Sequence, residues 1–157
     1  IEQTLAQYST HAQPVARLGF FRLPQYFSSA LLNGATVVVV PTVPVPPLSA
    51  LGLTEFADFE HGNYGGITYN TMYFVRTDHL HLETTHYHEL IHVLQWQRLG
   101  VDRFLQVYAL GLLQYGYLNS PLEVMARRHQ RRFESGEQPY GVEATVLSEI
   151  DDLMQSI

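Results

Sequence analysis

The sequence predicts an α+β fold, in which a small sheet precedes a mainly helical C-terminal half. Two runs rich in β-branched and aromatic residues, 36–40 and 67–75, indicate the strands. From residue 83 onward, apolar residues recur at helical spacing almost to the end of the chain. A length of 157 residues and a hydrophobic content of 46% are typical of one globular domain, so we expect a single domain over 1–157.

The N-terminal half is expected to contain one short helix, followed by irregular chain and strands. Residues 24–32 predict the helix, because a proline suits its first position and an Asn-Gly pair follows it. The run 36–40 predicts a buried strand, and 67–75 predicts a strand or one limb of a hairpin. Between these strands, the prolines of 41–53 predict extended chain, which we interpret as a rigid connector without a function of its own.

Four helices are expected in the C-terminal half. Gly100 should end the first of them, and Thr84 or Thr85 is a suitable cap at its start. The apolar stretch 105–118 is too short for a membrane span and is expected to form a buried core helix. The expected helices cover residues 84–99, 102–116, 121–134 and 143–155.

The pentapeptide from His88 to His92 has the pattern H-E-x-x-H. Residues i and i+4 project from one face of a helix, so His88 and His92 can converge on one metal ion. Glu89 lies about 100° around the helix from His88, where it can reach a metal-bound water without ligating the metal. Two histidines, a carboxylate and a Zn²⁺ ion with an open coordination position are what metal-assisted hydrolysis requires. The motif therefore predicts a zinc hydrolase.

A third protein ligand is needed, because catalytic zinc usually has three and keeps the fourth position for water. Glu123 is the best candidate, since it lies in the first turn of the helix that begins at Pro121. A glutamate is also favoured there by its interaction with the helix dipole. Spacing alone leaves both explanations open.

The segment 88–95, followed further along the chain by 121–126, resembles the gluzincin zinc metallopeptidases. In that group, two histidines of the H-E-x-x-H helix and a glutamate from a separate helix bind the zinc. The resemblance covers residues 65–130 and implies a minimal, single-domain, zincin-like endopeptidase. It implies that Glu123 is the third ligand and that Glu89 is the general base acting on zinc-activated water.

One position departs from the pattern of thermolysin-type gluzincins. Those enzymes carry an acidic residue four positions after the glutamate ligand, where it orients a zinc-bound histidine, and this chain has Arg127 there. Other groups must therefore orient the histidines. Asn119, Gln95 and a backbone carbonyl are the candidates.

Tyr115 and Tyr117 lie between the metal helix and the glutamate helix, and either could stabilise an oxyanion. Aromatic residues in an apolar helix more often belong to the core, so this role competes with a structural one. The strand 67–75 could pair with an extended peptide substrate. Because the chain is short, we expect a shallow site or a contribution from a second chain.

The remaining histidines near the motif are expected to have ordinary roles. His86 should point away from the metal face into solvent. His79 and His81, with Asp78, could bind a second ion, but a polar loop is the simpler interpretation. No separate metal site is therefore predicted from them.

Composition excludes several classes of function. A formal charge of -6, without a cluster of basic residues over one face, argues against nucleic-acid binding. The absence of cysteine excludes disulfides and thiolate zinc ligands. No membrane span is predicted, and the expected partner is a peptide or protein substrate. The sequence indicates neither the compartment nor the oligomeric state.

Two alternatives to a general peptidase remain at this stage. The domain could be a catalytically silent zinc-binding or regulatory module, although a purely structural site would have no need of Glu89. It could also be an effector protease directed at one partner, which would look inactive on generic peptides.

Overall fold

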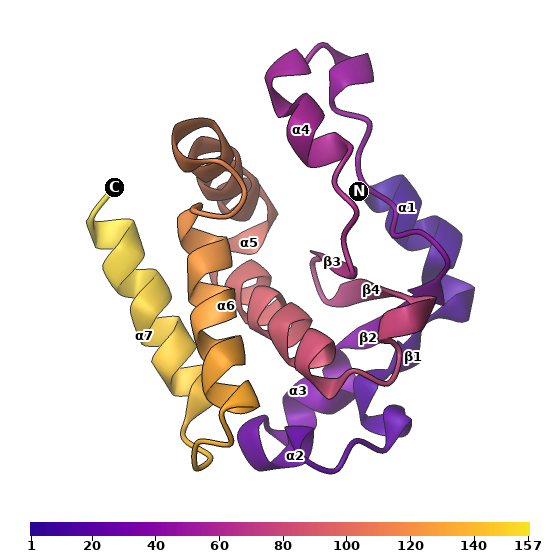
Figure 1. The fold of residues 1–157 in the computed structure, drawn as a ribbon, viewed down its shortest axis with the longest axis vertical. Helices are drawn as coiled ribbons and strands as arrows, with labels where there is room; N and C mark the ends of the chain where they lie inside the picture. Colours follow the sequence, from indigo (N-terminus) through magenta and orange to yellow (C-terminus); the bar gives the residue numbers. More distant parts are fainter.

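The computed structural model describes residues 1–157, apart from the side chain of Leu51. The first half of the chain forms a four-stranded sheet with short helices around it, and the second half forms long helices (Figure 1). The predicted α+β class, with a small sheet before a mainly helical C-terminal half, is confirmed.

The sheet has the strand order β1-β2-β4-β3. Its central strands, β2 (Thr36–Val40) and β4 (Met72–Arg76), are parallel to each other. The outer strands, β1 (Gln13–Pro14) and β3 (Gly66–Tyr69), pair with them in antiparallel orientation. The strand β3 is therefore an edge of the sheet, and its hairpin with β4 leads through a short 3-10 turn, η5 (Thr77–His79), to the helix that carries H-E-x-x-H.

The predicted strand 36–40 is confirmed, whereas 67–75 proves to contain both limbs of a hairpin. The strands β3 and β4 are joined by a tight turn in which Asn70 has φ 60. Asparagine adopts this left-handed conformation more readily than most residues. The β-forming residues on both sides of the turn concealed it in the sequence.

The predicted helix 24–32 is wrong as a single element, because the chain forms α2 (Leu23–Tyr26) and α3 (Ser29–Gly34). Phe27 between them is extended and buried in the core. Ser28 then caps α3, its hydroxyl accepting a hydrogen bond of 3.1 Å from the Leu31 amide. The helix α1 (Glu2–Tyr8) and a short 3-10 turn (Ser9–His11) precede these elements.

The segment after β2 remains irregular through its prolines, as expected, and then forms short helical turns. These are η3 (Ser49–Leu51), η4 (Thr54–Phe56) and α4 (Ala57–Glu60). Together they form an arm that projects away from the sheet (Figure 1). We call residues 46–64 the arm.

The helix α5 (Glu83–Tyr115) is broken at Gly100, where φ is 76 and ψ is 167. It therefore corresponds to the two predicted helices, with Gly100 ending the first as expected. Its start differs from the prediction, because Leu82 occupies the cap position and provides no side-chain hydrogen bond. The helices α6 (Pro121–Glu134) and α7 (Val142–Gln155) agree with the predicted ranges.

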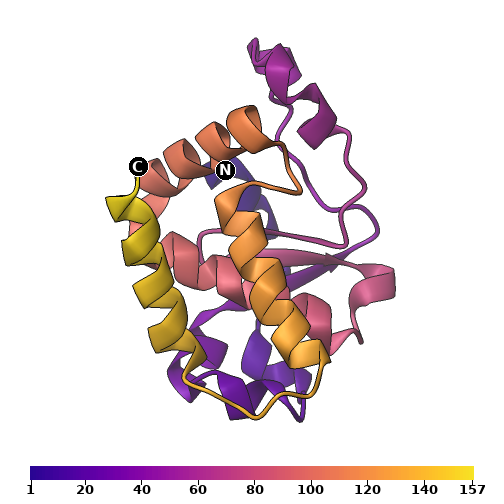
Figure 2. The ribbon, with the colours of Figure 1, turned by 60° about the vertical axis from the view of Figure 1, so that its left-hand side comes forward.

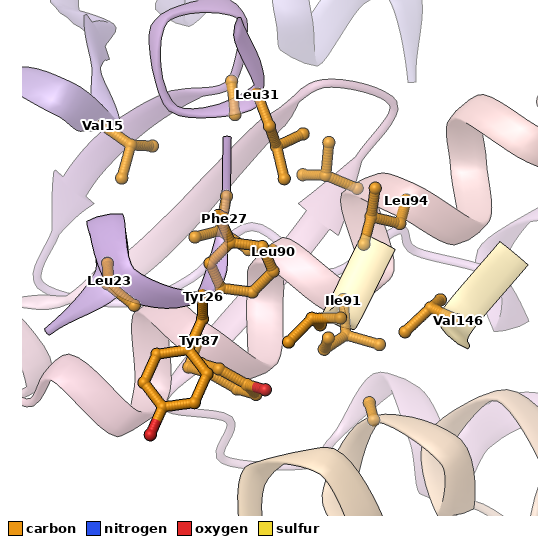
Figure 3. Close-up of a cluster of buried hydrophobic side chains, with 14 of the residues drawn as sticks. Val15, Leu23, Tyr26, Phe27, Leu31, Tyr87, Leu90, Ile91, Leu94 and Val146 are labelled. Atoms are coloured by element: carbon orange, nitrogen blue, oxygen red, sulfur yellow. The ribbon is translucent and has the colours of Figure 1, made fainter. Parts of the chain in front are cut away.

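The first half of α5 crosses the centre of the core. Its side chains Leu90, Ile91 and Leu94 meet Phe27 on one side and Val146 of α7 on the other (Figure 3). Burying an aliphatic side chain of this size stabilises the folded state by roughly 1.5–3 kcal/mol. This packing fixes the helix that carries the metal-binding motif.

The second half of α5 is not the buried core helix that the apolar stretch 105–118 suggested. Leu110 is 56% exposed and Leu118 is 66% exposed. Only one face of this half, including Phe104 and Val107, is buried, and the helix lies at the edge of the molecule (Figure 2). Within the described residues, no helix has both the length and the apolar character needed to cross a membrane.

Candidate metal centre

His88, His92 and Glu123, the three predicted ligands, lie together between α5 and α6. Their nearest ring nitrogens, Nε2 of His88 and Nε2 of His92, are 3.1 Å apart. Each nitrogen also lies 3.3 Å from a Glu123 oxygen, Oε2 for His88 and Oε1 for His92. In the described part of the chain, this is the one group of three histidine or acidic side chains that lie close enough together to hold a metal ion. We call His88, His92 and Glu123 the metal group.

Close packing of two helices puts Glu123 in position. A Cβ atom added at Gly111 of α5 would lie 3.0 Å from Cδ of Pro121 and 3.1 Å from Cβ of Ser120. The glycine therefore lets α5 approach the first turn of α6, where Glu123 projects toward the two histidines. Pro121 occupies the start of that helix, as predicted.

A glutamine orients each histidine. The Nδ1 atom of His92 lies 2.7 Å from Oε1 of Gln95, and the Nδ1 atom of His88 lies 2.7 Å from Oε1 of Gln130. The amide nitrogens donate elsewhere, to the Leu122 carbonyl and the Glu134 carboxylate, which can only accept. The amide oxygens therefore face the histidines and hold both protons on Nδ1. Both Nε2 lone pairs are left for a metal.

These facing lone pairs require a positive charge between them. Burial opposes the charged form of His92, but the neighbouring Glu123 carboxylate outweighs it and raises the pKa of His92 to about 9. Burial likewise opposes ionisation of Glu123, but both histidines hold the pKa of Glu123 well below its usual value. One oxygen of Glu123, Oε2, is buried without a hydrogen-bond partner among the described residues. A cation, either a proton or a metal ion, would therefore be stabilised between these three side chains.

The spacing of the ligand atoms is compatible with a bound metal ion. The Nε2 atoms of His88 and His92 are 3.1 Å apart, and each lies 3.3 Å from a different oxygen of Glu123. One ligand atom from each residue lies within 4.8 Å of the other two, so His88, His92 and Glu123 can hold a metal ion.

The groups that orient the histidines were only partly predicted. Gln95 was one of the three candidates, and Asn119 is not involved. Gln130 was missed, although it lies seven residues after Glu123 and thus on the same face of α6. Arg127 occupies the position that is acidic in thermolysin-type enzymes, and its Nη1 atom lies 3.9 Å from Oε2 of Glu123.

Glu89 is buried beside the ligands and is held by the edge strand β3. The Thr68 hydroxyl donates a hydrogen bond of 2.7 Å to Oε2 of Glu89. A Cβ atom at Gly66 would lie 2.7 Å from Oε1, so any larger residue there would displace this carboxylate from its observed position. Burial raises the pKa of Glu89, and the two histidines and Thr68 oppose that shift. Gly66 and Thr68 are two residues apart in β3, so they lie on one face of the strand and both adjoin the Glu89 carboxylate.

The two predicted tyrosines differ in their positions. Tyr117 lines the cavity beside the metal group, whereas Tyr115 is 49% exposed and is not among the residues described as lining it. Burial, with the charges of Glu123 and Glu89, raises the pKa of Tyr117, so its phenol stays protonated and can donate. Tyr108 was missed by the sequence analysis, and its hydroxyl donates a hydrogen bond of 2.7 Å to Oε1 of Glu123.

The prediction that His86 is exposed is wrong. Its Nε2 atom donates to the Leu80 carbonyl at 2.8 Å, and the Tyr73 hydroxyl donates to its Nδ1 atom at 2.7 Å. Burial lowers the pKa of His86 to about 4, so the ring is neutral and structural. The sequence around His86 does not show that the β3–β4 hairpin covers this face of α5, so the burial of His86 could not be predicted.

His79 and Asp78 are held in contacts within the protein. His79 lies 2.8 Å from the Thr85 hydroxyl, and Asp78 pairs with Arg76 at 2.6 Å. No second group with metal-binding spacing is found in the part of the chain that the structure describes. Part of the predicted polar loop is helical, because Thr77–His79 form the 3-10 turn η5.

A cavity of about 420 Å³ adjoins the metal group. One wall is the arm, and the other is the second half of α5, while β3 and the metal group lie between them. We expected a shallow site or a contribution from a second chain, whereas this cavity is formed between elements of one chain. The proline-rich connector also contributes, because Pro46, Leu48 and Leu53 line the cavity.

No family model, curated protein or solved structure matches this chain. Its function is therefore inferred from the site itself, where two helices bring together His88, His92 and Glu123 beside a buried Glu89.

Proposed function

We propose that the protein is a zinc-dependent endopeptidase of the gluzincin type. One observation carries this proposal: His88, His92 and Glu123 converge while Glu89 lies buried beside them with its carboxylate held by Thr68. A site that only stabilised the fold would have no use for a buried, oriented carboxylate next to three ligands. The adjoining cavity offers space for a substrate.

A zinc ion held by His88, His92 and Glu123 would polarise the substrate carbonyl and make a water molecule more acidic. Glu89 would take a proton from the attacking water and deliver it to the departing amine. Its Oε1 atom would do this, because Oε2 accepts the Thr68 hydrogen bond. Burial raises the pKa of Glu89 toward the range in which a carboxylate is an effective base.

Other groups would bind and orient the peptide. Tyr117 would donate to the carbonyl oxygen as negative charge develops on it. The edge strand β3 lines the cavity and would pair with an extended substrate, so that the bond to be cleaved faces the metal.

The first test is the metal content of the purified protein. Elemental analysis after exhaustive dialysis should find about one zinc per chain in the wild type and clear loss in Glu123→Ala. Equal zinc in both proteins would remove Glu123 from the ligand set. A wild type that binds no zinc even after zinc is added back would overturn the proposal.

The second test separates catalysis from metal binding. Glu89→Gln should keep its zinc and lose peptide cleavage by about 10²–10⁴-fold, measured on a broad peptide pool. Glu55→Gln, at an exposed position in η4, is the matched control and should behave as wild type. Zinc binding without any cleavage by the wild type would favour the catalytically silent module.

A further inference from the structure

The cavity is apolar except at its metal end. Among the residues described as lining it, the charged or ionisable side chains other than tyrosine are His88, Glu89, His92 and Glu123. The facing walls carry large apolar side chains that include Leu53, Phe56 and Phe59 on the arm, and Leu105, Ala109 and Leu112 on α5. A charged group entering between these walls would lose its hydration and find no partner.

Most of the polar groups of the cavity tyrosines are already used within the protein. The Tyr64 hydroxyl donates to the Phe59 carbonyl at 2.7 Å, and the Tyr69 hydroxyl donates to the Pro44 carbonyl. Tyr108 donates to Glu123. These three phenols therefore present their rings, rather than their hydroxyl groups, to an occupant.

One buried N–H group of a lining residue lacks a partner. Trp96 lines the cavity, and its indole N–H is buried without a hydrogen-bond partner among the described residues. Leaving such a donor unpaired costs free energy, and a carbonyl oxygen would satisfy it. An occupant with carbonyl groups and apolar side chains matches both the walls and this donor.

Apolar side chains at the rim of the cavity are also exposed to solvent. Leu53 of the arm and Leu105 of α5 line the cavity and are exposed. Covering them removes apolar surface from water, which favours a bound chain that extends past the rim. The volume of about 420 Å³ lies in the range typical of sites for small ligands or short peptide segments.

We propose that the cavity binds an uncharged peptide segment whose side chains are large and aliphatic or aromatic. The inference rests on the proposed function for the statement that this segment flanks the cleaved bond. The binding itself depends only on the walls, the rim and Trp96. Acidic or basic residues in the same segment would be excluded.

Trp96 is the single tryptophan of the chain, so its fluorescence reports on the cavity directly and without zinc or turnover. We would titrate metal-free protein with the blocked dipeptide N-acetyl-Leu-Phe-amide. The matched probe is N-acetyl-Asp-Phe-amide, and octanamide represents an acyl chain. The uncharged dipeptide should bind at least about tenfold more tightly than the acidic one.

Phe59→Lys places a positive charge in the wall, where it can pair with the carboxylate of the acidic dipeptide, and should abolish the preference for the uncharged dipeptide. The control is Phe21→Lys, since Phe21 is 84% exposed and is not among the described lining residues. If Phe59→Lys does not fold, Leu105→Lys at the exposed rim tests the same point. Equal binding of the acidic and uncharged dipeptides, or no fluorescence change with either, would overturn the inference. Tighter binding of octanamide than of the dipeptide would overturn it in favour of an acyl chain.

A second titration links the cavity to the metal. Zinc-loaded protein would be titrated with straight-chain hydroxamates from acetohydroxamate to octanohydroxamate. Each added methylene should tighten binding about three- to fourfold if the chain enters the apolar cavity. Failure of acetohydroxamate itself to bind would count against the zinc site, whereas binding without dependence on chain length would count against the apolar cavity.

Discussion

The two halves of α5, which meet at the break at Gly100, play opposite parts in the molecule. Before Gly100 the helix is buried on nearly every side and carries His88, Glu89 and His92. After Gly100 it touches the protein along one face and leaves leucines such as Leu110 in solvent. The buried first half is the more polar of the two in sequence, so composition does not explain the difference.

The elements that surround each half of α5 explain why one half is buried and the other is exposed. The first half lies against the sheet and the short N-terminal helices on one side, and against α6 and α7 on the other. The second half contacts the start of α6 through Gly111 and faces the arm across the cavity. The first half therefore positions His88 and His92, whereas the second half shapes the adjoining cavity.

The largest contrast should appear in stability when matched leucines are truncated. Leu90→Ala, at a fully buried position, should lower the free energy of unfolding by about 2–5 kcal/mol because it leaves a cavity. Leu110→Ala should change it by less than about 0.5 kcal/mol. Urea unfolding of both variants measures the difference. Equal losses would mean that the second half of α5 is covered in solution.

The next effect is the response of the metal-free protein to pH. The pKa of His92 is raised to about 9 from 6.5, so its stabilising contribution is complete below pH 6.5 and is lost as pH rises through 9. The free energy of unfolding should fall by an amount on the order of a few kcal/mol over this window. Zinc-loaded protein should not show this fall, because the metal replaces the proton.

Thermal unfolding at pH 6.5 and pH 9, with and without zinc, tests this response. His92→Asn removes the titrating group and should remove the pH dependence of the metal-free protein. Below pH 6.5 the contribution of His86 has the opposite sign, because burial lowers its pKa to about 4. A metal-free wild type with constant stability between pH 6.5 and 9 would contradict the assignment.

The break between the halves can be tested at Gly100. Its φ of 76 and ψ of 167 are adopted almost only by glycine, so Gly100→Ala should cost about 1–3 kcal/mol although a Cβ would meet no atom within 4 Å. Gly34→Ala is the control, since that glycine also has open space but no positive φ. Comparable stability of both variants would show that the two halves can join as one straight helix.

Replacing one glutamine in each half of α5 should affect the zinc affinity differently. Gln95→Leu removes the group that orients His92 and should weaken zinc binding by about 10–100-fold. Gln106→Leu, at an exposed position of the second half, should leave the affinity unchanged. Competition with a zinc chelator measures both. An unchanged affinity in Gln95→Leu would mean that packing alone orients His92.

The smallest expected effect is on catalysis and concerns the edge strand β3, which contacts the first half of α5 through Thr68. Thr68→Val should keep zinc and lower peptide cleavage about tenfold, because Glu89 loses its orienting hydrogen bond. That bond also lowers the pKa of Glu89, so the acid limb of the pH-rate profile should move to higher pH. Thr68→Ser should restore both the rate and the profile, whereas a merely structural role for Thr68 would leave the profile unmoved.

Several features could be predicted from the sequence because short-range rules encode them. H-E-x-x-H places two histidines on one face of any helix, and the glycine at 100 and the proline at 121 mark where helices end and begin. These rules were sufficient for the fold class, the ranges of the C-terminal helices and the candidate ligands. They also raised Glu123 as the third ligand, which the structure places beside the histidines.

Other features depended on contacts between distant segments. A repeating apolar pattern indicates a helix but not how many of its faces other elements cover, so 105–118 looked buried and His86 looked exposed. For the same reason, the sequence could not place Thr68 against Glu89, Tyr108 against Glu123 or the arm across the cavity. The sequence by itself determined which residues could form a metal group, because helical spacing is local. Only the tertiary structure decided what surrounds that group, because burial and hydrogen bonding there join segments far apart in the chain.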